Sequence, residues 1–145
     1  MNLRRKPVSV LVVEDNNADA ELVVDGFRET DPDVTVHVAA SGDEALRLLR
    51  ALEEPELPDL IFMDLNLPRV GGLDAIAAIK ADLELQVIPV LVLTTSTSER
   101  EIRGSYAAGA AAVLNKPMRL ADHRMMMRAV ASFWLGNVRL PRRGL

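Results

Sequence analysis

The sequence contains no cysteine, few aromatic residues and only two histidines. The lack of thiols excludes disulfides, iron–sulfur clusters and thiolate zinc sites. The histidines, His37 and His123, are too far apart in sequence to form a ligand-spaced pair. No apolar run approaches the roughly 18 residues of a membrane span, and the basic N-terminus leads into a strand-length run rather than a signal peptide. We therefore expect a cytoplasmic protein with no membrane contact.

Strong positive charge is also lacking, because the net charge is −4. This charge argues against nucleic acid as the main partner. Basic residues gather at both ends, and we interpret them as solvated termini, with a partner contact as the alternative. They are Arg4, Arg5 and Lys6 at the start, and Arg139, Arg142 and Arg143 at the end. At 145 residues with 49% apolar residues, the chain can bury roughly 68–70% of its unfolded surface as one domain. We expect a single domain over 1–145, with a core at about 8–136 and a tail at 137–145.

Five short apolar runs alternate with helical patterns along the chain. Most of these runs are apolar throughout and bounded by turn residues, which is typical of strands buried on both faces of a parallel sheet. In 34–38, valines alternate with polar residues, as in an edge strand. The pattern predicts an α/β three-layer sandwich, with helices on both faces of the sheet. The expected strands are 8–13, 34–38, 60–63, 90–93 and 111–114; the expected helices are 19–30 (capped by Asn17), 45–52 and 98–108 (with capping boxes at 41–44 and 98–101), 73–81, and 120–135.

Polar residues follow four of the apolar runs, at the points where the strands are expected to end. They are Glu14 and Asp15, Asp64, Thr94, and Lys116. Because ligands collect at the carboxyl ends of parallel strands, we expect these side chains to meet. Each has an ordinary structural reading on its own: Asp64 as a turn residue, Lys116 as a surface lysine. The joint occurrence at four strand ends favours a functional site.

This set of side chains suits phosphoryl chemistry. Glu14, Asp15 and Asp64 can supply oxygen ligands to Mg²⁺, which binds through a few carboxylates. Asp64 can attack phosphorus to form an aspartyl phosphate. Lys116 and the metal can neutralise charge on the transferring group, and Thr94 can donate a hydrogen bond to it.

The same residues carry a resemblance to a known family. The chain resembles the receiver domain of bacterial two-component response regulators (CheY-like) over nearly its whole length. Three stretches are similar to single-domain regulators paired with phytochrome histidine kinases: the Val-Glu-Asp-Asn opening, the Leu-Thr-Thr-Ser stretch, and the end of the sequence with Phe133 and Trp134. The motifs that carry the resemblance are Val-Val-Glu14-Asp15, Met-Asp64-Leu-Asn66-Leu-Pro68 with Gly72, Leu-Thr94-Thr95-Ser96, and Gly109 with Lys116-Pro117.

The resemblance implies a flavodoxin-like five-stranded parallel sheet of order 2-1-3-4-5 with five helices. It implies that Asp64 is the phosphoacceptor, that Thr94 is the switch hydroxyl and that Lys116 is the phosphate partner. The metal, Mg²⁺, would be held by Glu14, Asp15, Asp64 and the backbone carbonyl of Asn66. A histidine kinase, of phytochrome type, would be the partner. Such a protein signals through protein contacts and is not an enzyme acting on a separate substrate.

One position departs from the receiver pattern. Receivers commonly carry Tyr or Phe three residues before the lysine, where this chain has Val113. Signalling through an aromatic rotamer is therefore not expected, and a phosphorylation-independent adaptor on the same fold stays open. A phosphatase of the haloacid dehalogenase type is disfavoured, because Asn66 stands where that chemistry needs a second acid to protonate the leaving group.

The last expected helix offers the readout surface. Leu120, Met127, Val130, Ala131 and Trp134 form one stripe, and Met126, Ala129 and Phe133 form an adjoining one. We expect one stripe to cover the sheet and the other to stay exposed, although a broadly buried helix remains an alternative. A methionine-rich exposed stripe beside aromatics is a reasonable binding face. We expect a homodimer through the last two helices and the strand between them.

Overall fold

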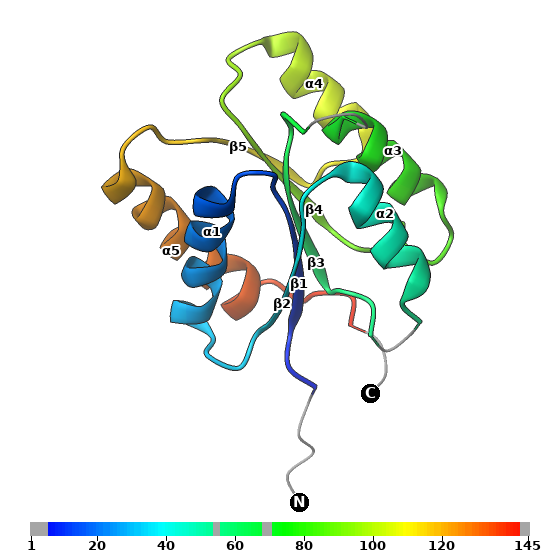
Figure 1. Ribbon diagram of the computed structural model, residues 1–145, viewed down its shortest axis with the longest axis horizontal. Coiled ribbons are helices and arrows are strands. Elements are labelled where there is room, and N and C mark those ends of the chain that lie inside the picture. Colours follow the sequence, from blue (N-terminus) through cyan, green and yellow to red (C-terminus); the bar gives the residue numbers. More distant parts are fainter. Residues whose placement is uncertain (1–5, 54–55, 68–70, 143–145) are drawn as a thin grey trace, which may run out of the picture.

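A computed structural model of the chain describes residues 6–53, 56–67 and 71–142. Strands and helices alternate throughout, as the sequence predicts (Figure 1). Most element ends agree with the predicted ones within two residues. The elements are β1 (Ser9–Val13), α1 (Asn17–Thr30), β2 (Thr35–Ala39), α2 (Gly42–Ala51), β3 (Leu60–Asp64), α3 (Gly72–Ala81), β4 (Val90–Thr94), α4 (Glu99–Ala108), β5 (Ala112–Asn115) and α5 (Leu120–Gly136).

The strands form one parallel sheet of order β2-β1-β3-β4-β5, which confirms the predicted fold class. Every residue of β1, β3 and β4 is buried, because helices cover both faces of these central strands. The outer strands β2 and β5 are partly exposed. The predicted edge position of β2 is therefore confirmed.

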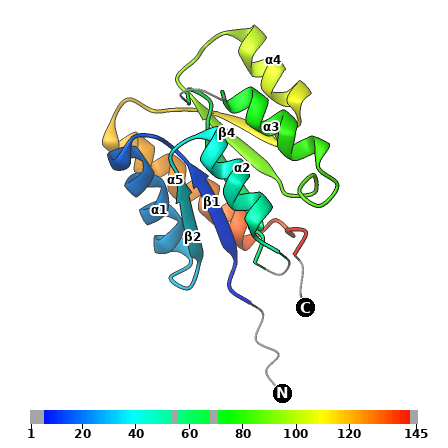
Figure 2. The same ribbon diagram turned by 45° about the vertical axis from the view of Figure 1, so that its right-hand side comes forward.

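The helices cover the sheet in two layers (Figures 1 and 2). α1 and α5 pack on one face, where Phe27 and Met127 meet Val10 and Val12 of β1. α2 and α3 pack on the other face against the alternate residues of β1, Leu11 and Val13. Side chains that alternate along one strand thus enter two separate apolar clusters. The three-layer sandwich follows directly from this alternation.

The helix starts use the side chains that the sequence suggests, with one correction. Ser41 accepts a hydrogen bond from the Glu44 N–H at 3.1 Å, and Ser98 accepts one from the Glu101 N–H at 3.4 Å. The cap of α1 is Asn16 and not the expected Asn17, because the Asn16 Oδ1 lies 3.0 Å from the Asp19 N–H. The helix begins two residues earlier than predicted, and the cap position moves with it.

α1 and α5 approach each other closely at Gly26. A Cβ placed on Gly26 would lie 2.6 Å from the Met127 Cβ, a distance that real side chains do not tolerate. Glycine therefore allows this helix contact, and any larger residue would force the two helices apart. Arg128 of α5 also reaches Glu29 of α1, with 4.0 Å between Nε and Oε2.

Burial along α5 partly follows the predicted stripes. Met127, Val130 and Ala131 are buried against the sheet, as expected. Leu120 is 52% exposed, so its assignment to the covering stripe is wrong. It is the first residue of the helix and lies outside the buried cluster of this face. Phe133 is 55% exposed and Ala129 also lies at the surface, whereas Met126 packs against the core, so the second stripe is exposed only in part.

The segment after α5 packs back across the amino ends of the strands. Arg142 donates a hydrogen bond to the Lys6 carbonyl, and its Nε lies 3.6 Å from the Asp59 carboxylate. Asp59 also accepts a hydrogen bond from the Ser9 N–H at 2.9 Å. The interpretation of the basic C-terminal end as solvated is thus wrong for Arg142, whose side chain is 16% exposed. Ser9, Asp59 and Arg142 are called the amino-edge cluster below.

Some predicted features fall on parts of the chain that are not described. Pro68 of the Asp64 motif and Arg4, Arg5 and Arg143 of the basic ends lie outside the described residues. Within the described residues, no helix has the length and apolar character that crossing a membrane requires.

Candidate functional site

The sheet register brings four of the predicted site segments to one edge. Val13 of β1 is paired with Met63 of β3, so Glu14 and Asp64 follow side by side. Asp64 is paired with Leu93 of β4, which places Thr94 one step beyond it. Thr94 is paired with Asn115, and the Lys116 N–H donates to the Thr94 carbonyl at 2.8 Å.

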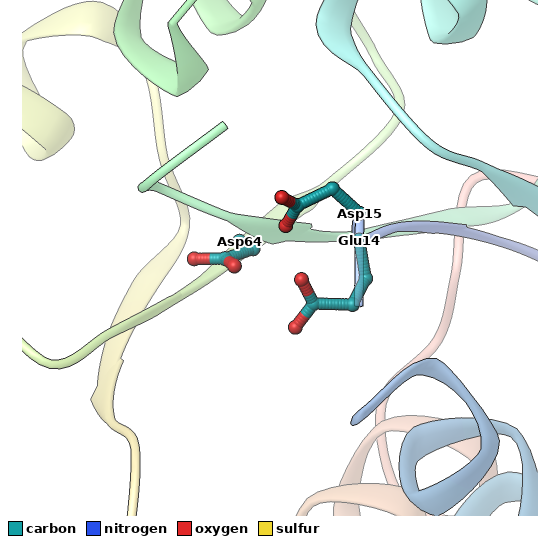
Figure 3. Close-up of side chains that lie close together, drawn as sticks. All are labelled: Glu14, Asp15 and Asp64. Atoms are coloured by element: carbon teal, nitrogen blue, oxygen red, sulfur yellow. The ribbon is translucent and has the colours of Figure 1, made fainter. Parts of the chain in front are cut away.

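Three carboxylates converge at this edge (Figure 3). One oxygen each from Glu14, Asp15 and Asp64 lies within 4.8 Å of the other two. Glu14 and Asp64 are 5% and 7% exposed, whereas Asp15 is open to solvent. We call these residues the acid triad.

The acid triad carries more negative charge than its surroundings neutralise. Burial and the adjacent Asp64 raise the pKa of Glu14 to about 7, despite the opposing effect of Lys116. Clustered carboxylates favour their charged forms only when a cation is added. Hard oxygen donors at this spacing are the ligand type that Mg²⁺ and Mn²⁺ prefer, so the residues present fit a divalent cation.

Asn66 lies just beyond Asp64 and is exposed. Its N–H donates to the Asp64 Oδ1 at 3.0 Å, and its side-chain amide donates to the Thr95 hydroxyl at 3.2 Å. These bonds fix the turn after β3 and orient the Asp64 carboxylate. The predicted role of the Asn66 carbonyl as a metal ligand stays a prediction.

Thr94 is fully buried at the end of β4. Its hydroxyl oxygen accepts a hydrogen bond from the Ser96 N–H at 3.0 Å. That bond uses a lone pair, so the hydroxyl proton remains available for an acceptor on the acid-triad side. The geometry is compatible with a switch hydroxyl, a role that stays a prediction.

Lys116 reaches into the site from the loop after β5. Its Nζ lies 3.3 Å from a Glu14 oxygen and 2.7 Å from an Asp19 oxygen. Burial alone would lower the pKa of Lys116, but Asp19 and Glu14 outweigh it and raise the pKa above its ordinary value. The ammonium is therefore charged and firmly paired with these two carboxylates. Its predicted contact with a phosphoryl group on Asp64 stays a prediction.

Two residues near the site were not anticipated. Asp19 lies in the first turn of α1, which begins shortly after the carboxyl end of β1. An acidic residue at this place in the sequence could have been recognised as a neighbour of the site. His123 of α5 is 3% exposed, and neither ring nitrogen has a hydrogen-bond partner within the described structure. Burial lowers the pKa of His123, with Asp19 opposing and Lys116 adding to this effect. His123 lies four and seven residues before Met127 and Val130, and this helical spacing was the signal that could have indicated its burial.

Val113, the position that departs from the receiver pattern, is half-buried in β5. Its N–H donates to the Tyr106 hydroxyl of α4 at 3.2 Å. A tyrosine therefore lies beside this strand, but it comes from the preceding helix and is half exposed. The aromatic contact of β5 is thus supplied by α4 and not by the strand itself.

Comparison with known proteins identifies the relatives of this fold and site. Residues 10–128 match the family described as the response regulator receiver domain. The chain is 37% identical to the response regulator Rcp1 of Synechocystis sp., over 93% of this chain and 94% of that protein. It is 36% identical to a probable methanogenesis regulatory protein, FilR2 of Methanothrix harundinacea, over 93% of this chain and 88% of that one.

A solved structure shares the whole architecture. The phosphorylated cyanobacterial phytochrome response regulator RcpA has a TM-score of 0.87 and 34% identity, with 94% of this chain and 99% of that chain covered. The Mn²⁺-bound form of Rcp1 has a TM-score of 0.85, with 93% and 99% covered at 37% identity.

Proposed function

Because this chain belongs to the response regulator receiver domain family, we propose that it accepts a phosphoryl group on Asp64. The observation that carries this proposal is the acid triad, in which a buried Asp64 lies beside two further carboxylates at the carboxyl edge of the sheet. The family gives the class of protein, and the burial and neighbours of Asp64 support its choice as the phosphoacceptor. The protein is a signalling component whose chemistry is confined to its own phosphorylation and dephosphorylation.

In the proposed reaction, an Asp64 oxygen attacks the phosphorus of a phosphohistidine on a kinase. The new O–P bond forms as the P–N bond breaks, and the histidine leaves with the bonding electrons. Asp64 starts as a carboxylate, so no proton has to be removed from the nucleophile. The Asn66 N–H, 3.0 Å from Oδ1, holds the carboxylate in place for the attack.

The acid triad would hold the divalent cation that this chemistry requires. Glu14, Asp15 and Asp64 are the proposed ligands, together with the Asn66 carbonyl. When bound, Mg²⁺ would neutralise the phosphoryl oxygens during transfer. Support comes from the spacing and burial of the carboxylates, because a cation would relieve the repulsion that Asp64 exerts on Glu14. The relative Rcp1 has been solved with Mn²⁺ bound.

Thr94 and Lys116 are the proposed partners of the transferred group. A phosphoryl group adds about −1.5 to −2 charges and several strong acceptor oxygens. The Thr94 hydroxyl and the Lys116 ammonium would donate to those oxygens and draw the loops after β4 and β5 toward Asp64. This movement would change the surface of the neighbouring helices, which is the output.

Intact-mass measurement tests the phosphorylation directly. The protein is incubated with acetyl phosphate and Mg²⁺, and we expect a gain of one phosphoryl group. Asp64→Asn should abolish the gain, and omission of Mg²⁺ should reduce it strongly. Asp25→Asn, an equal charge change at an exposed position of α1, should leave it intact. Failure of the wild-type protein to gain mass would favour a phosphorylation-independent adaptor on the same fold.

We further propose a histidine kinase of the phytochrome type as the phosphoryl donor, and a cytoplasmic location beside it. Support comes from RcpA, named as a phytochrome response regulator, which matches nearly the full length of this chain. Phosphotransfer profiling against the histidine kinases of the same genome tests this pairing. Faster transfer from a kinase without a phytochrome sensor would contradict it.

Output through a homodimer is the remaining part of the proposal. Phe133 and Met118 are exposed apolar side chains on and before α5, and Tyr106 of α4 is half exposed. By helical spacing, Phe133 lies on the side of α5 away from Arg128, which faces α1. The surface of α4, β5 and α5 thus offers apolar side chains to a second copy. Sedimentation equilibrium that shows a strict monomer, with and without beryllofluoride, would exclude the dimer; Phe133→Ser should weaken it.

A further inference from the structure

Lys116 has two carboxylate partners of different character. The nearer one, the Asp19 Oδ2 at 2.7 Å, belongs to a side chain that is 30% exposed. The other, the Glu14 Oε1 at 3.3 Å, belongs to a side chain that is 3% exposed. The Lys116 side chain is 17% exposed, so its ammonium depends on these partners rather than on water.

We propose that Asp19 is a positioning residue, which holds Lys116 in the unphosphorylated protein and releases it to the phosphoryl group on Asp64. This inference rests on the proposed function, because the phosphoryl group is the competitor for the lysine. Asp19 would thereby set the affinity of the site for a phosphoryl group. It contacts Lys116 and not the reacting atoms, so its effect must pass through the lysine.

The difference in exposure decides which partner is exchanged. A released Glu14 carboxylate would stay buried, because its side chain is only 3% exposed. A released Asp19 can be hydrated at once, because its side chain already reaches solvent. The phosphoryl group carries about twice the charge of a carboxylate, so it attracts Lys116 more strongly than Asp19 does. The exchange therefore costs least when Asp19 is the partner that leaves.

The position of Asp19 gives the exchange a second consequence. Its backbone N–H is held by the Asn16 cap, so the helix start is fixed and the side chain alone is free to change partner. Release of Lys116 leaves an unpaired carboxylate in the first turn of α1, within electrostatic reach of the buried His123 on α5. Phosphorylation would thus alter the charge between α1 and α5 without any aromatic side chain at position 113.

A double-mutant cycle tests the resting ion pair in the unphosphorylated protein without metal. The variants are Asp19→Asn, Lys116→Met and the double variant, and the readout is the urea midpoint. We expect Asp19→Asn to lower the midpoint when the lysine is present. In the Lys116→Met background it should leave the midpoint unchanged or raise it, because repulsion with the acid triad is then relieved. Asp25→Asn should give the same shift in both backgrounds, whereas equal effects of Asp19→Asn in both would overturn the ion pair.

Binding of beryllofluoride in the presence of Mg²⁺ tests the exchange. We expect Asp19→Asn to bind this phosphoryl mimic more tightly than wild type, by up to about fivefold, the upper end of the contribution of a partly exposed ion pair. The gain should vanish in the Lys116→Met background, which a merely structural role of Asp19 would not produce. Unchanged or weaker binding by Asp19→Asn would overturn the exchange. Absence of binding by the wild-type protein would overturn the exchange and the proposed function together. The double-mutant cycle in urea would still test the ion pair between Asp19 and Lys116 independently.

Discussion

The two edges of the sheet hold charged groups in opposite states of balance. At the carboxyl edge, three carboxylates of the acid triad gather around one binding region, and Lys116 divides its charge between Glu14 and Asp19. In the amino-edge cluster, the single carboxylate of Asp59 has an arginine at 3.6 Å and an amide N–H at 2.9 Å. One edge has an excess of negative charge and the other does not.

This difference separates a binding site from a structural contact. An excess of buried like charge costs folding free energy that a bound cation recovers, which is typical of a site that binds a ligand. A carboxylate matched by its own cation and amide requires nothing further, and it joins the end of the chain to the start of β1 and β3. The stability of variants at the two edges should therefore depend differently on metal and on pH.

The largest expected effect is stabilisation of the carboxyl edge by Mg²⁺. At a free concentration one hundred times the dissociation constant, a ligand that binds only the folded state adds about 2.7 kcal/mol to the free energy of unfolding. Asp64→Asn should remove most of this gain because it deletes a ligand. Arg142→Met, at the other edge, should keep it in full. Urea unfolding with and without Mg²⁺ measures all three; an equal gain in Asp64→Asn would contradict the metal site.

The second effect is a pH dependence carried by Glu14. Its pKa is raised from 4.5 to about 7 in the folded protein, so the folded state keeps a proton that the unfolded state loses. This contribution to stability is fully present below pH 4.5 and is lost as the pH rises through about 7, on the order of 2 kcal/mol after allowance for solvent.

The comparison of wild type with Glu14→Gln isolates this contribution from other titrating groups. In metal-free urea unfolding, the stability of wild type relative to Glu14→Gln should fall between pH 5 and about 7.5. Mg²⁺ should flatten the difference. A relative stability that rises with pH would show that Glu14 is ionised at little cost, and that the acid triad is not in excess.

The third effect concerns the amino-edge cluster. Arg142→Met leaves Asp59, whose side chain is 11% exposed, with the Ser9 amide as its remaining polar partner there. Removal of one partner of a fully buried pair costs about 3–5 kcal/mol, and the partial exposure and length of this contact reduce our expectation to about 1–2 kcal/mol. Thermal unfolding without metal measures it. Arg139→Met, an exposed change in the same segment, is the matched control.

The smallest effect tests the local geometry that positions Asp19. Asn16→Ala removes the cap of α1 and should cost about 1 kcal/mol. Asn17→Ala should cost much less, because Asn17 is the first helical residue and not the cap. Urea unfolding of the two variants compares them under one condition. A loss in Asn17→Ala as large as that in Asn16→Ala would contradict Asn16 as the cap of α1.

Much of the site was predictable because it depends on strand ends. The apolar runs before Glu14, Asp64 and Thr94 define where each central strand stops, and parallel pairing then brings these ends together. The partner of Lys116 was not predictable in this way. Asp19 reaches the lysine from a helix, and its direction depends on the cap at Asn16.

The packing of the chain end was also beyond the sequence pattern. Arg142 belongs to the basic end of the chain, which favours a solvated terminus, yet it reaches Asp59, which lies far earlier in the chain. His123 shares the buried face of α5 with Met127 and Val130, but the lack of a hydrogen-bond partner for its ring within the described structure is a result of packing that the spacing does not predict. Long-range side-chain partners such as these follow from tertiary packing rather than from local preference.

The contact between Gly26 and Met127 has a consequence for how this sequence can diverge. A side chain at position 26 collides with the Met127 Cβ itself, an atom that no rotamer change can remove. In descendants of this protein, an exchange of Gly26 for a larger residue should survive only with a compensating shift of the backbone of α5, not with a smaller residue at 127 short of glycine. The pair should therefore vary together or not at all, and lineages that keep Gly26 inherit a fixed spacing between these two helices.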